Sequence, residues 1–204
     1  VDELLVIDIS ASEKKTEPNY RLIEEFAGEC FIPLTYGGGI KDLEQAKTLF
    51  SIGIEKLSIQ TAALEDTKII SKISNKFGAQ SVVGSVDVKK DWLGNYKLFN
   101  RNLQTLKSLD WKETIQTFVE AGAGEILLNS VDKDGTMNGP DLKLISKACQ
   151  DIDVPVVALG GVSSLEDIRN CVRAGADAVA AGSYFVFQGP HRAVLISYPN
   201  YNEL

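Results

Sequence analysis

Short apolar runs alternate with amphipathic stretches along the whole chain. Each apolar run is typical of a buried strand, and each amphipathic stretch has helical spacing. The expected strands are 4–9, 31–36, 57–59, 81–86, 126–128, 154–159 and 178–181, and the expected helices are 21–26, 43–52, 67–77, 111–121, 141–150 and 163–174. Strict alternation predicts a parallel sheet, and the similar unit lengths favour a closed (β/α)₈ barrel over a doubly wound sheet. We expect Ser163 and Glu166 to form a capping box that opens the last of these helices.

The chain also aligns with itself without gaps at an offset of 122 residues. Glu3 falls on Glu125, Gly38-Gly39 on Gly160-Gly161, and Thr61 on the similar Ser183. These matches cluster at strand ends and helix starts, where turn geometry and ligand contacts are set. We therefore predict one barrel domain over residues 1–204 that contains two half-barrel repeats, residues 1–61 and 123–183.

Seven strands in a pattern of four plus four leave one unit without a partner. The strand that ends at Asp87 lacks a counterpart, which the offset would place before Val1. One further unit of ~40 residues would give the ~250 residues usual for this barrel. We expect an N-terminally truncated barrel that lacks the first βα unit, and we expect residues upstream to encode a strand ending in an acid.

Composition excludes several classes of protein. The 204 residues carry a net charge of −7, which leaves no basic face for nucleic acid. No apolar run approaches membrane-spanning length, and the cysteines lack metal-ligand spacing. The single histidine, His191, almost excludes a zinc site or a serine–histidine triad. We expect a cytoplasmic protein with no metal, no cofactor and no membrane partner.

Two polar, glycine-bearing sets follow the predicted strands. The first set is Gly38, Gly39, Gln60 and Thr61, and the second is Asp134, Gly135, Thr136, Gly160, Gly161, Gly182 and Ser183. Glycine lets backbone N–H groups approach an anion, and the following helix N-termini favour negative charge. The alternative is that these glycines only make tight turns. Two sets at one barrel end predict a long substrate with a phosphate at each end.

Asp87 is the strongest catalytic candidate. It ends an apolar strand, so its carboxyl group should stand at the barrel mouth, partly desolvated, as a general acid or base. The alternative is a strand-end aspartate that caps the next loop. Asp8 and Asp132 are weaker candidates that can equally orient loops or turns.

Two further groups have open interpretations. Glu3, Lys56 and Glu125 begin three strands, and they predict either a charged ring at the bottom of the barrel or ordinary rim charges. Residues 91–110 predict a hairpin whose aromatic residues either cover the site as a lid or pack on the barrel surface. These aromatic residues are Trp92, Tyr96 and Phe99.

Several motifs together resemble one known family. They are LLVIDISAS, TYGGGI, LSIQTAA, VVGSVDVKK, GAGEILLNSVDKDGTMNG, LGGV and AGADAVAAGS. In this order they resemble the cyclase subunit of imidazole glycerol phosphate synthase, the HisF family, from Val1 to about Phe187.

The resemblance implies a lyase of histidine biosynthesis that takes ammonia through the barrel from a glutaminase subunit docked at the bottom. Ammonia would convert a bis-phosphorylated formimino-carboxamide ribotide to imidazole glycerol phosphate and an aminoimidazole carboxamide ribotide. Asp87 matches one member of the family's acid/base pair. Glu3, Lys56 and Glu125 match its ammonia gate.

Departures from the family pattern lie at the substrate pocket. Gln60 stands where asparagine is usual, Asn129 with Ser130 where Thr-Ser is usual, Leu159 where serine is usual, and Pro140 where tyrosine is usual. The tail after residue 187 is more similar to a cyclase-like branch associated with surface-polysaccharide genes, in which ammonia would amidate a sugar precursor. A non-catalytic phosphate-binding scaffold for a glutaminase is a further alternative.

Overall fold

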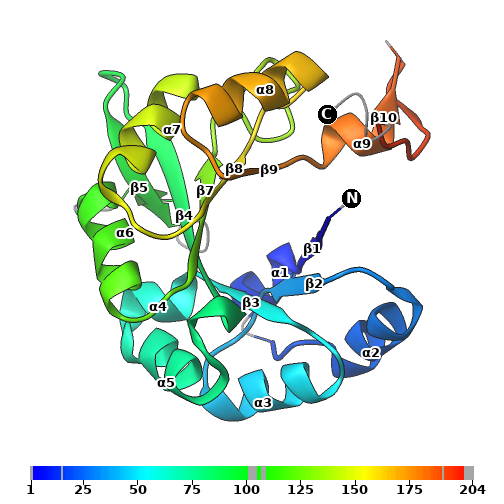
Figure 1. Cartoon of the computed structure of the whole chain (residues 1–204), viewed down its shortest axis with the longest axis vertical. Helices are drawn as coiled ribbons and strands as arrows, with labels where there is room; N and C mark the ends of the chain where they lie inside the picture. Colours follow the sequence, from blue (N-terminus) through cyan, green and yellow to red (C-terminus); the bar gives the residue numbers. More distant parts are fainter. Residues whose placement is uncertain (1, 15, 101–104, 107–108, 190, 200–204) are drawn as a thin grey trace.

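A computed structural model shows seven parallel strands in one curled sheet, with helices on its outer side (Figure 1). The structure describes residues 2–14, 16–100, 105–106, 109–189 and 191–199. The strand order is β1-β2-β3-β4-β7-β8-β9, which is chain order once the side branch of β5 and β6 is set apart. The arrangement is that of a (β/α)₈ barrel represented by seven strands, and it confirms the fold class predicted from the alternating pattern.

The strands lie close to the apolar runs. They are β1 Leu4–Ile7, β2 Leu34–Gly37, β3 Lys56–Ile59, β4 Val82–Lys90, β7 Glu125–Ser130, β8 Val156–Leu159 and β9 Ala178–Ala180. Neighbours along this path pair in parallel. β1 ends earlier than predicted because a short helix, α1 (Ile9–Lys14), begins at Ile9. The Asp8 carboxylate accepts the N–H groups of Ser10 and Ala11 there, each at 3.0 Å.

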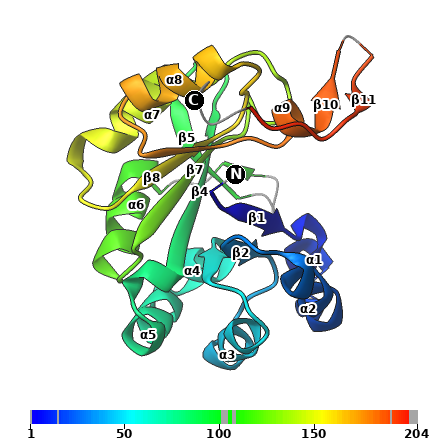
Figure 2. The same ribbon diagram turned by 45° about the vertical axis from the view of Figure 1, so that its right-hand side comes forward.

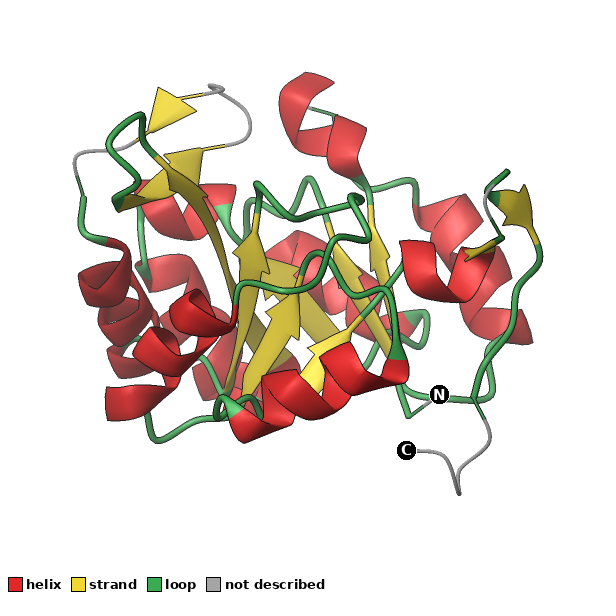
Figure 3. Ribbon diagram, turned by 90° about the horizontal axis from the view of Figure 1, so that it is seen from above, coloured by secondary structure: helices red, strands yellow, loops and turns green. Residues whose placement is uncertain are grey.

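The helices form the outer layer that surrounds the strands (Figure 3). They are α2 Tyr20–Glu29, α3 Leu43–Ser51, α4 Thr61–Glu65, α5 Lys68–Phe77, α6 Trp111–Glu120, α7 Leu142–Ala148, α8 Leu165–Arg173 and α9 Ser183–Val186, with 3₁₀ turns at Ala79–Ser81 and Cys149–Asp151. The predicted capping box was wrong by one residue. Ser164 caps α8 by accepting the N–H of Asp167 at 3.1 Å, while Ser163 donates to the Asp167 carboxylate.

The core lies between the sheet and the helices. Leu57 and Ile59 of β3 belong to this core together with Ile70 and Ile73 of α5, and all four are nearly fully buried. Burial of each such side chain contributes about 1.5–3 kcal/mol. Successive strand residues point to opposite faces, so the alternate positions of β3, which begin with Lys56, face the inner side of the curled sheet.

The hairpin after β4 combines buried and exposed aromatic residues. β4 pairs antiparallel with β5 (Tyr96–Asn100), which pairs with β6 (Thr105–Leu106). Phe99 is buried, whereas Trp92 at the turn is 91% exposed, so the aromatic residues do not act together as one lid. Residues 101–104 and 107–108 of the predicted hairpin lie outside the described part.

A second, smaller hairpin of β10 (Phe187–Gln188) and β11 (Ala193–Val194) projects from the barrel beyond α9 (Figure 2). Its residue 190 is not among the described positions. Of the helices that the structure describes, none has the length and apolar character needed to cross a membrane.

Candidate functional site

Asp87 and Asn129 form a buried polar pair near the carboxyl ends of adjacent strands. Asp87 of β4 lies opposite Asn129 of β7 in the parallel register, and the two residues are only 5% and 4% exposed. Asn129 Nδ2 donates to Asp87 Oδ1 at 2.9 Å. The structure thus brings together the catalytic candidate and a residue predicted separately as substrate-binding.

The second glycine-bearing set is built from loops in direct contact. Gly160 has φ +109°, and a Cβ there would lie 2.7 Å from the carbonyl oxygen of Ser130. The N–H of Gly139 donates to the carbonyl oxygen of Gly161 at 2.9 Å, which joins the loop after β7 to the loop after β8. Gly182-Ser183 follows β9, the strand that pairs with β8. A larger residue at position 160 would obstruct this close backbone approach.

The first set has the same construction near the start of the strand path. Gly38 has φ +126°, and a Cβ there would lie 2.5 Å from the carbonyl oxygen of Asp8. Gln60 directly precedes α4, which begins at Thr61. Within the described chain the Gln60 Nε2 atom is buried and has no hydrogen-bond partner. Both glycine-bearing sets therefore lie at the carboxyl ends of their strands.

Ser130 does not share the surroundings of Asn129. Ser130 lines a recess between the sheet and the outer helices, together with Pro140, Leu144 and Cys171. Because successive side chains of a strand point to opposite faces, Asn129 and Ser130 are not placed to face one ligand together.

The loop after β7 holds the remaining residues of the second set, Asp134, Gly135 and Thr136. The N–H of Asp134 donates to the carbonyl oxygen of Ser130 at 3.0 Å, which turns the chain back toward the strand end. Arg192 of the C-terminal hairpin donates to the carbonyl oxygen of Gly135 at 2.9 Å. The tail therefore contacts this loop, a contact that no sequence pattern indicated.

A further polar cluster, centred on Asp141, was not predicted either. Lys90 Nζ and the Tyr96 hydroxyl each contact one carboxylate oxygen of Asp141 at 2.7 Å, and Asp141 also caps α7. Burial acts to raise the pKa of Asp141, but the hydrogen bonds from Lys90, Tyr96 and the Leu144 N–H outweigh burial and hold that pKa below its usual value. Burial, followed by the Asp141 carboxylate, raises the pKa of Tyr96 to about 12.

The two weaker aspartate candidates have loop roles in the structure. Asp8 accepts main-chain N–H groups of its own turn, and Asp132 accepts the N–H of Lys90 at 2.7 Å. These contacts agree with the alternative interpretation of both residues as loop or turn residues.

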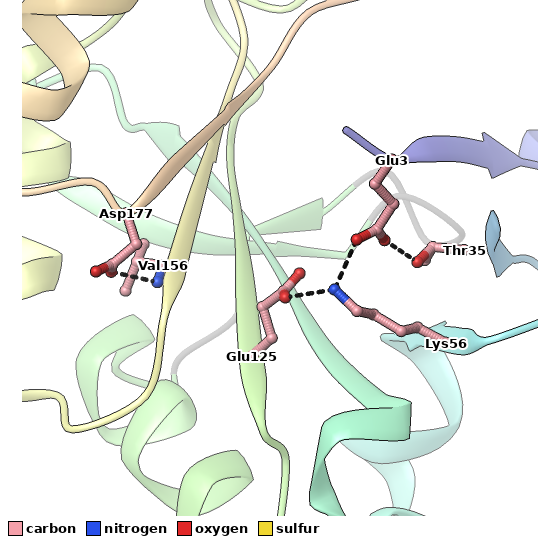
Figure 4. Close-up of polar contacts among 6 residues, drawn as sticks. All are labelled: Glu3, Thr35, Lys56, Glu125, Val156 and Asp177. Carbon is pink, nitrogen blue, oxygen red and sulfur yellow. Dashed lines mark hydrogen bonds and ion pairs between the residues drawn. The ribbon is translucent and has the colours of Figure 1, made fainter. Parts of the chain in front are cut away.

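At the opposite ends of the strands, three charged side chains join β1, β3 and β7 (Figure 4). Lys56 Nζ lies 2.6 Å from Glu3 Oε2 and 2.9 Å from Glu125 Oε2. Thr35 Oγ1, which sequence reasoning missed, donates to the other carboxylate oxygen of Glu3. Burial acts to lower the pKa of Lys56, but its bonds to the two glutamates prevail and raise that pKa.

This ion-pair cluster differs from isolated rim charges because one cation is shared by two acids from different strands. The side chains of Glu3, Lys56 and Glu125 are 29%, 25% and 18% exposed, so they are partly withdrawn from water. Asp177, drawn in the same view, accepts the N–H of Val156 at 2.8 Å and fixes the start of β8 (Figure 4). No group of three metal-ligating side chains occurs among the described residues.

The curled parallel sheet and the polar residues at its strand ends define a (β/α)₈-barrel protein with its candidate site in the usual place for this fold. The chain belongs to the family described as "Histidine biosynthesis protein", which matches residues 1–191. This match and the names of relatives confirm the resemblance to the HisF family.

Three relatives illustrate the match. A Pseudomonas aeruginosa protein with the provisional name imidazole glycerol phosphate synthase subunit hisF2 is 51% identical over 212 residues, which cover 100% of this chain and 82% of the relative. A Leptospira borgpetersenii protein with a similarly provisional HisF name is 47% identical, covering 98% of this chain and 79% of the relative. Imidazole glycerol phosphate synthase subunit HisF of Dictyoglomus thermophilum is 40% identical, covering 91% and 74%.

Proposed function

We propose that this protein is the ammonia-dependent cyclase of an imidazole glycerol phosphate synthase, a lyase of histidine biosynthesis. It would convert a bis-phosphorylated formimino-carboxamide ribotide and ammonia to imidazole glycerol phosphate and an aminoimidazole carboxamide ribotide. The observation that carries the proposal is the buried Asp87 carboxylate at a strand end, hydrogen-bonded to Asn129. The names of the relatives support the same assignment.

In this proposal Asp87 transfers protons as one half of a general acid/base pair. A carboxyl group at a desolvated strand end can hold or release a proton during ring closure. The first glycine-bearing set would bind one phosphate and the second set the other, with backbone N–H groups as donors. The two sets lie on strands on either side of β4, which suits a substrate that spans Asp87.

The bottom cluster would admit ammonia from a glutaminase subunit. Lys56 between Glu3 and Glu125 joins three strands through side-chain ion pairs alone. Opening such a cluster requires side-chain rotation and leaves the backbone hydrogen bonds of the sheet intact. A glutaminase docked at this end would release ammonia at the end of the barrel opposite to the one that holds Asp87.

The test is turnover of the ribotide by the full-length protein, first with ammonium and then with glutamine and a glutaminase subunit. We expect activity with ammonium, and Asp87→Asn should lower kcat by about 10²–10⁴-fold, the usual contribution of acid–base catalysis. Asp153→Asn, at an exposed position outside the site, is the matched control. Full activity in Asp87→Asn would remove Asp87 from the mechanism, and absence of turnover in the parent would remove the reaction.

A second candidate function is the supply of ammonia for amidation of a sugar precursor in surface-polysaccharide synthesis. It is favoured by the departures from the family pattern at Gln60, Asn129 and Leu159, whereas Pro140 lies with Ser130 in the recess on the helix side of the sheet. Relatives at 44–51% identity carry provisional names, whereas those at 37–40% are named HisF without qualification. Ammonium-dependent amidation of a nucleotide sugar, without turnover of the ribotide, would support this alternative. If the protein turns over neither substrate but still binds the glutaminase subunit, the remaining interpretation is a non-catalytic phosphate-binding scaffold.

A further inference from the structure

The Asn129 side chain has its two polar atoms in different surroundings. Nδ2 donates to Asp87 Oδ1 on β4, at 2.9 Å. Oδ1 lies toward the loop after β8, because a Cβ placed on Gly160 would be 3.4 Å from it. The amide nitrogen therefore faces the Asp87 carboxyl group, which accepts its hydrogen bond, and the carbonyl oxygen faces the glycine loop.

The carbonyl oxygen of Asn129 is unsatisfied. It is buried and has no hydrogen-bond partner in the described part of the chain, and the residue as a whole is 4% exposed. A buried acceptor without a donor costs about 1–3 kcal/mol, whereas a leucine of similar size would avoid this cost. The hydrogen bond to Asp87 explains why position 129 carries an amide nitrogen. It does not explain why a carbonyl oxygen is buried at the same position.

We propose that Asn129 is a positioning residue for Asp87 and also the acceptor that selects a substrate with a hydroxyl or N–H group between Asp87 and the Gly160 loop. The proposal rests on the proposed function for the role of Asp87 as acid or base. The second set of loops would hold a phosphate of the same substrate, so the class is a phosphorylated compound with a hydrogen-bond donor close to that phosphate. One amide would then align the catalytic group and the substrate with each other.

The test compares three substitutions in the full-length protein. Asn129→Leu removes both polar atoms at similar volume. Asn129→Thr keeps a hydroxyl that can donate to Asp87 and accept from the substrate. Asn75→Leu, on the exposed side of α5, is the matched control.

For Asn129→Leu we expect KM for the ribotide to rise about tenfold, because one hydrogen bond to the substrate is lost, and kcat to fall by a further factor of about 10–100. Asn129→Thr should recover most of both losses, and Asn75→Leu should change neither. A residue that only tied β4 to β7 would lower stability without changing KM. Unchanged KM and kcat in folded Asn129→Leu would overturn the proposal.

A second readout does not depend on turnover. The carbon-13 resonance of the Asp87 carboxyl group can be followed against pH in the parent and in the variants. Loss of the Nδ2 donor should move its titration midpoint to higher pH in Asn129→Leu, because that donor favours the ionised form. If the parent lacks ribotide turnover but this midpoint moves, the proposed reaction fails and the positioning contact stands. If the midpoint stays in place, the positioning role is rejected whatever the activity.

Discussion

Residues 1–61 and 123–183 can be compared position by position at the offset of 122 residues. Gly38 and Gly160 have φ values of +126° and +109°, and a Cβ on either would meet the carbonyl oxygen of Asp8 or Ser130. These two carbonyl oxygens are themselves 122 positions apart. The two segments thus repeat one backbone contact, in which a glycine passes directly over the end of the preceding strand.

The helix starts match in the same way. Asn19 accepts the N–H of Leu22 at the start of α2, and Asp141 accepts the N–H of Leu144 at the start of α7. The side chains in the two segments nevertheless differ where chemistry is expected. Ile7 occupies the position that corresponds to Asn129. The comparison teaches that this main-chain geometry is common to both segments, while Asn129, the amide that donates to Asp87, belongs to the second segment.

The largest expected effect comes from breaking the shared glycine contact. Gly38→Ala and Gly160→Ala should each lower the free energy of unfolding by about 3 kcal/mol, because each adds strain at positive φ and a clash with a carbonyl oxygen. Urea unfolding followed by circular dichroism measures both. Gly28→Ala, inside α2 with nothing within 4 Å of its Cβ, should instead stabilise by about 1 kcal/mol. Losses in only one of the two glycine variants would show that the segments are not equivalent.

A smaller effect should separate the two helix caps. Asn19→Ala removes an exposed cap and should cost about 1 kcal/mol. Asp141→Ala removes a cap together with the contacts to Lys90 and Tyr96, and it should cost about 2–3 kcal/mol. Unfolding free energies at about pH 7 test the order of the two losses.

The Asp141 contribution should also depend on pH. Its folded pKa lies below the ordinary value of 3.8, so the stabilisation is present above about pH 3.8 and is lost as the pH falls through the folded value. The difference between the parent and Asp141→Asn should therefore shrink in acid, whereas Asn19→Ala should lose the same amount throughout. A difference for Asp141→Asn that persists in strong acid would argue against the ion pair as its source.

The smallest effect is expected at the bottom cluster. Lys56→Met should destabilise by less than about 1 kcal/mol, because the ion pairs that it removes are only partly buried. The pKa of Lys56 is raised above 10.5, so its contribution is complete below that pH and is lost as the pH rises through the folded value. Unfolding at about pH 8 and above pH 10.5 checks the sign, with exposed Lys72→Met as control. An equal loss in both variants would mean that the cluster adds nothing beyond a surface charge.

Sequence patterns identified the strands of the main sheet, the helices α2, α3, α5, α6, α7 and α8, and the glycine turns, because apolar periodicity and positive-φ positions leave local signals. They did not predict the short helices α1, α4 and α9. They identified Asp87 and Asn129 separately but did not join them, since the contact depends on the register between β4 and β7. They also grouped Asn129 with Ser130, whose side chain faces the helix layer. Register and strand face are set by packing over the whole sheet, so a local pattern cannot carry them.

Other contacts were missed for a related reason. Thr35 of β2 donates a hydrogen bond to Glu3, which precedes the neighbouring strand β1. Lys90 contacts Asp141, which lies 51 residues further along the chain. Neither partner has a spacing that marks it. The short helix α1 was missed because Asp8 turns the chain just after β1, which shortens an apolar run that otherwise extends to Ile9.

The two tryptophans, Trp92 and Trp111, give the molecule a pair of built-in optical reporters. Trp92 is 91% exposed at the hairpin turn, whereas Trp111 is 5% exposed. The ring of Trp111 lies edge-on to the ring of Tyr96, with 6.2 Å between the ring centroids. A dissolved quencher will therefore extinguish the emission of Trp92 first. The emission that survives comes from Trp111, whose neighbour Tyr96 is hydrogen-bonded to Asp141, so a simple fluorescence measurement follows that junction through folding and ligand binding.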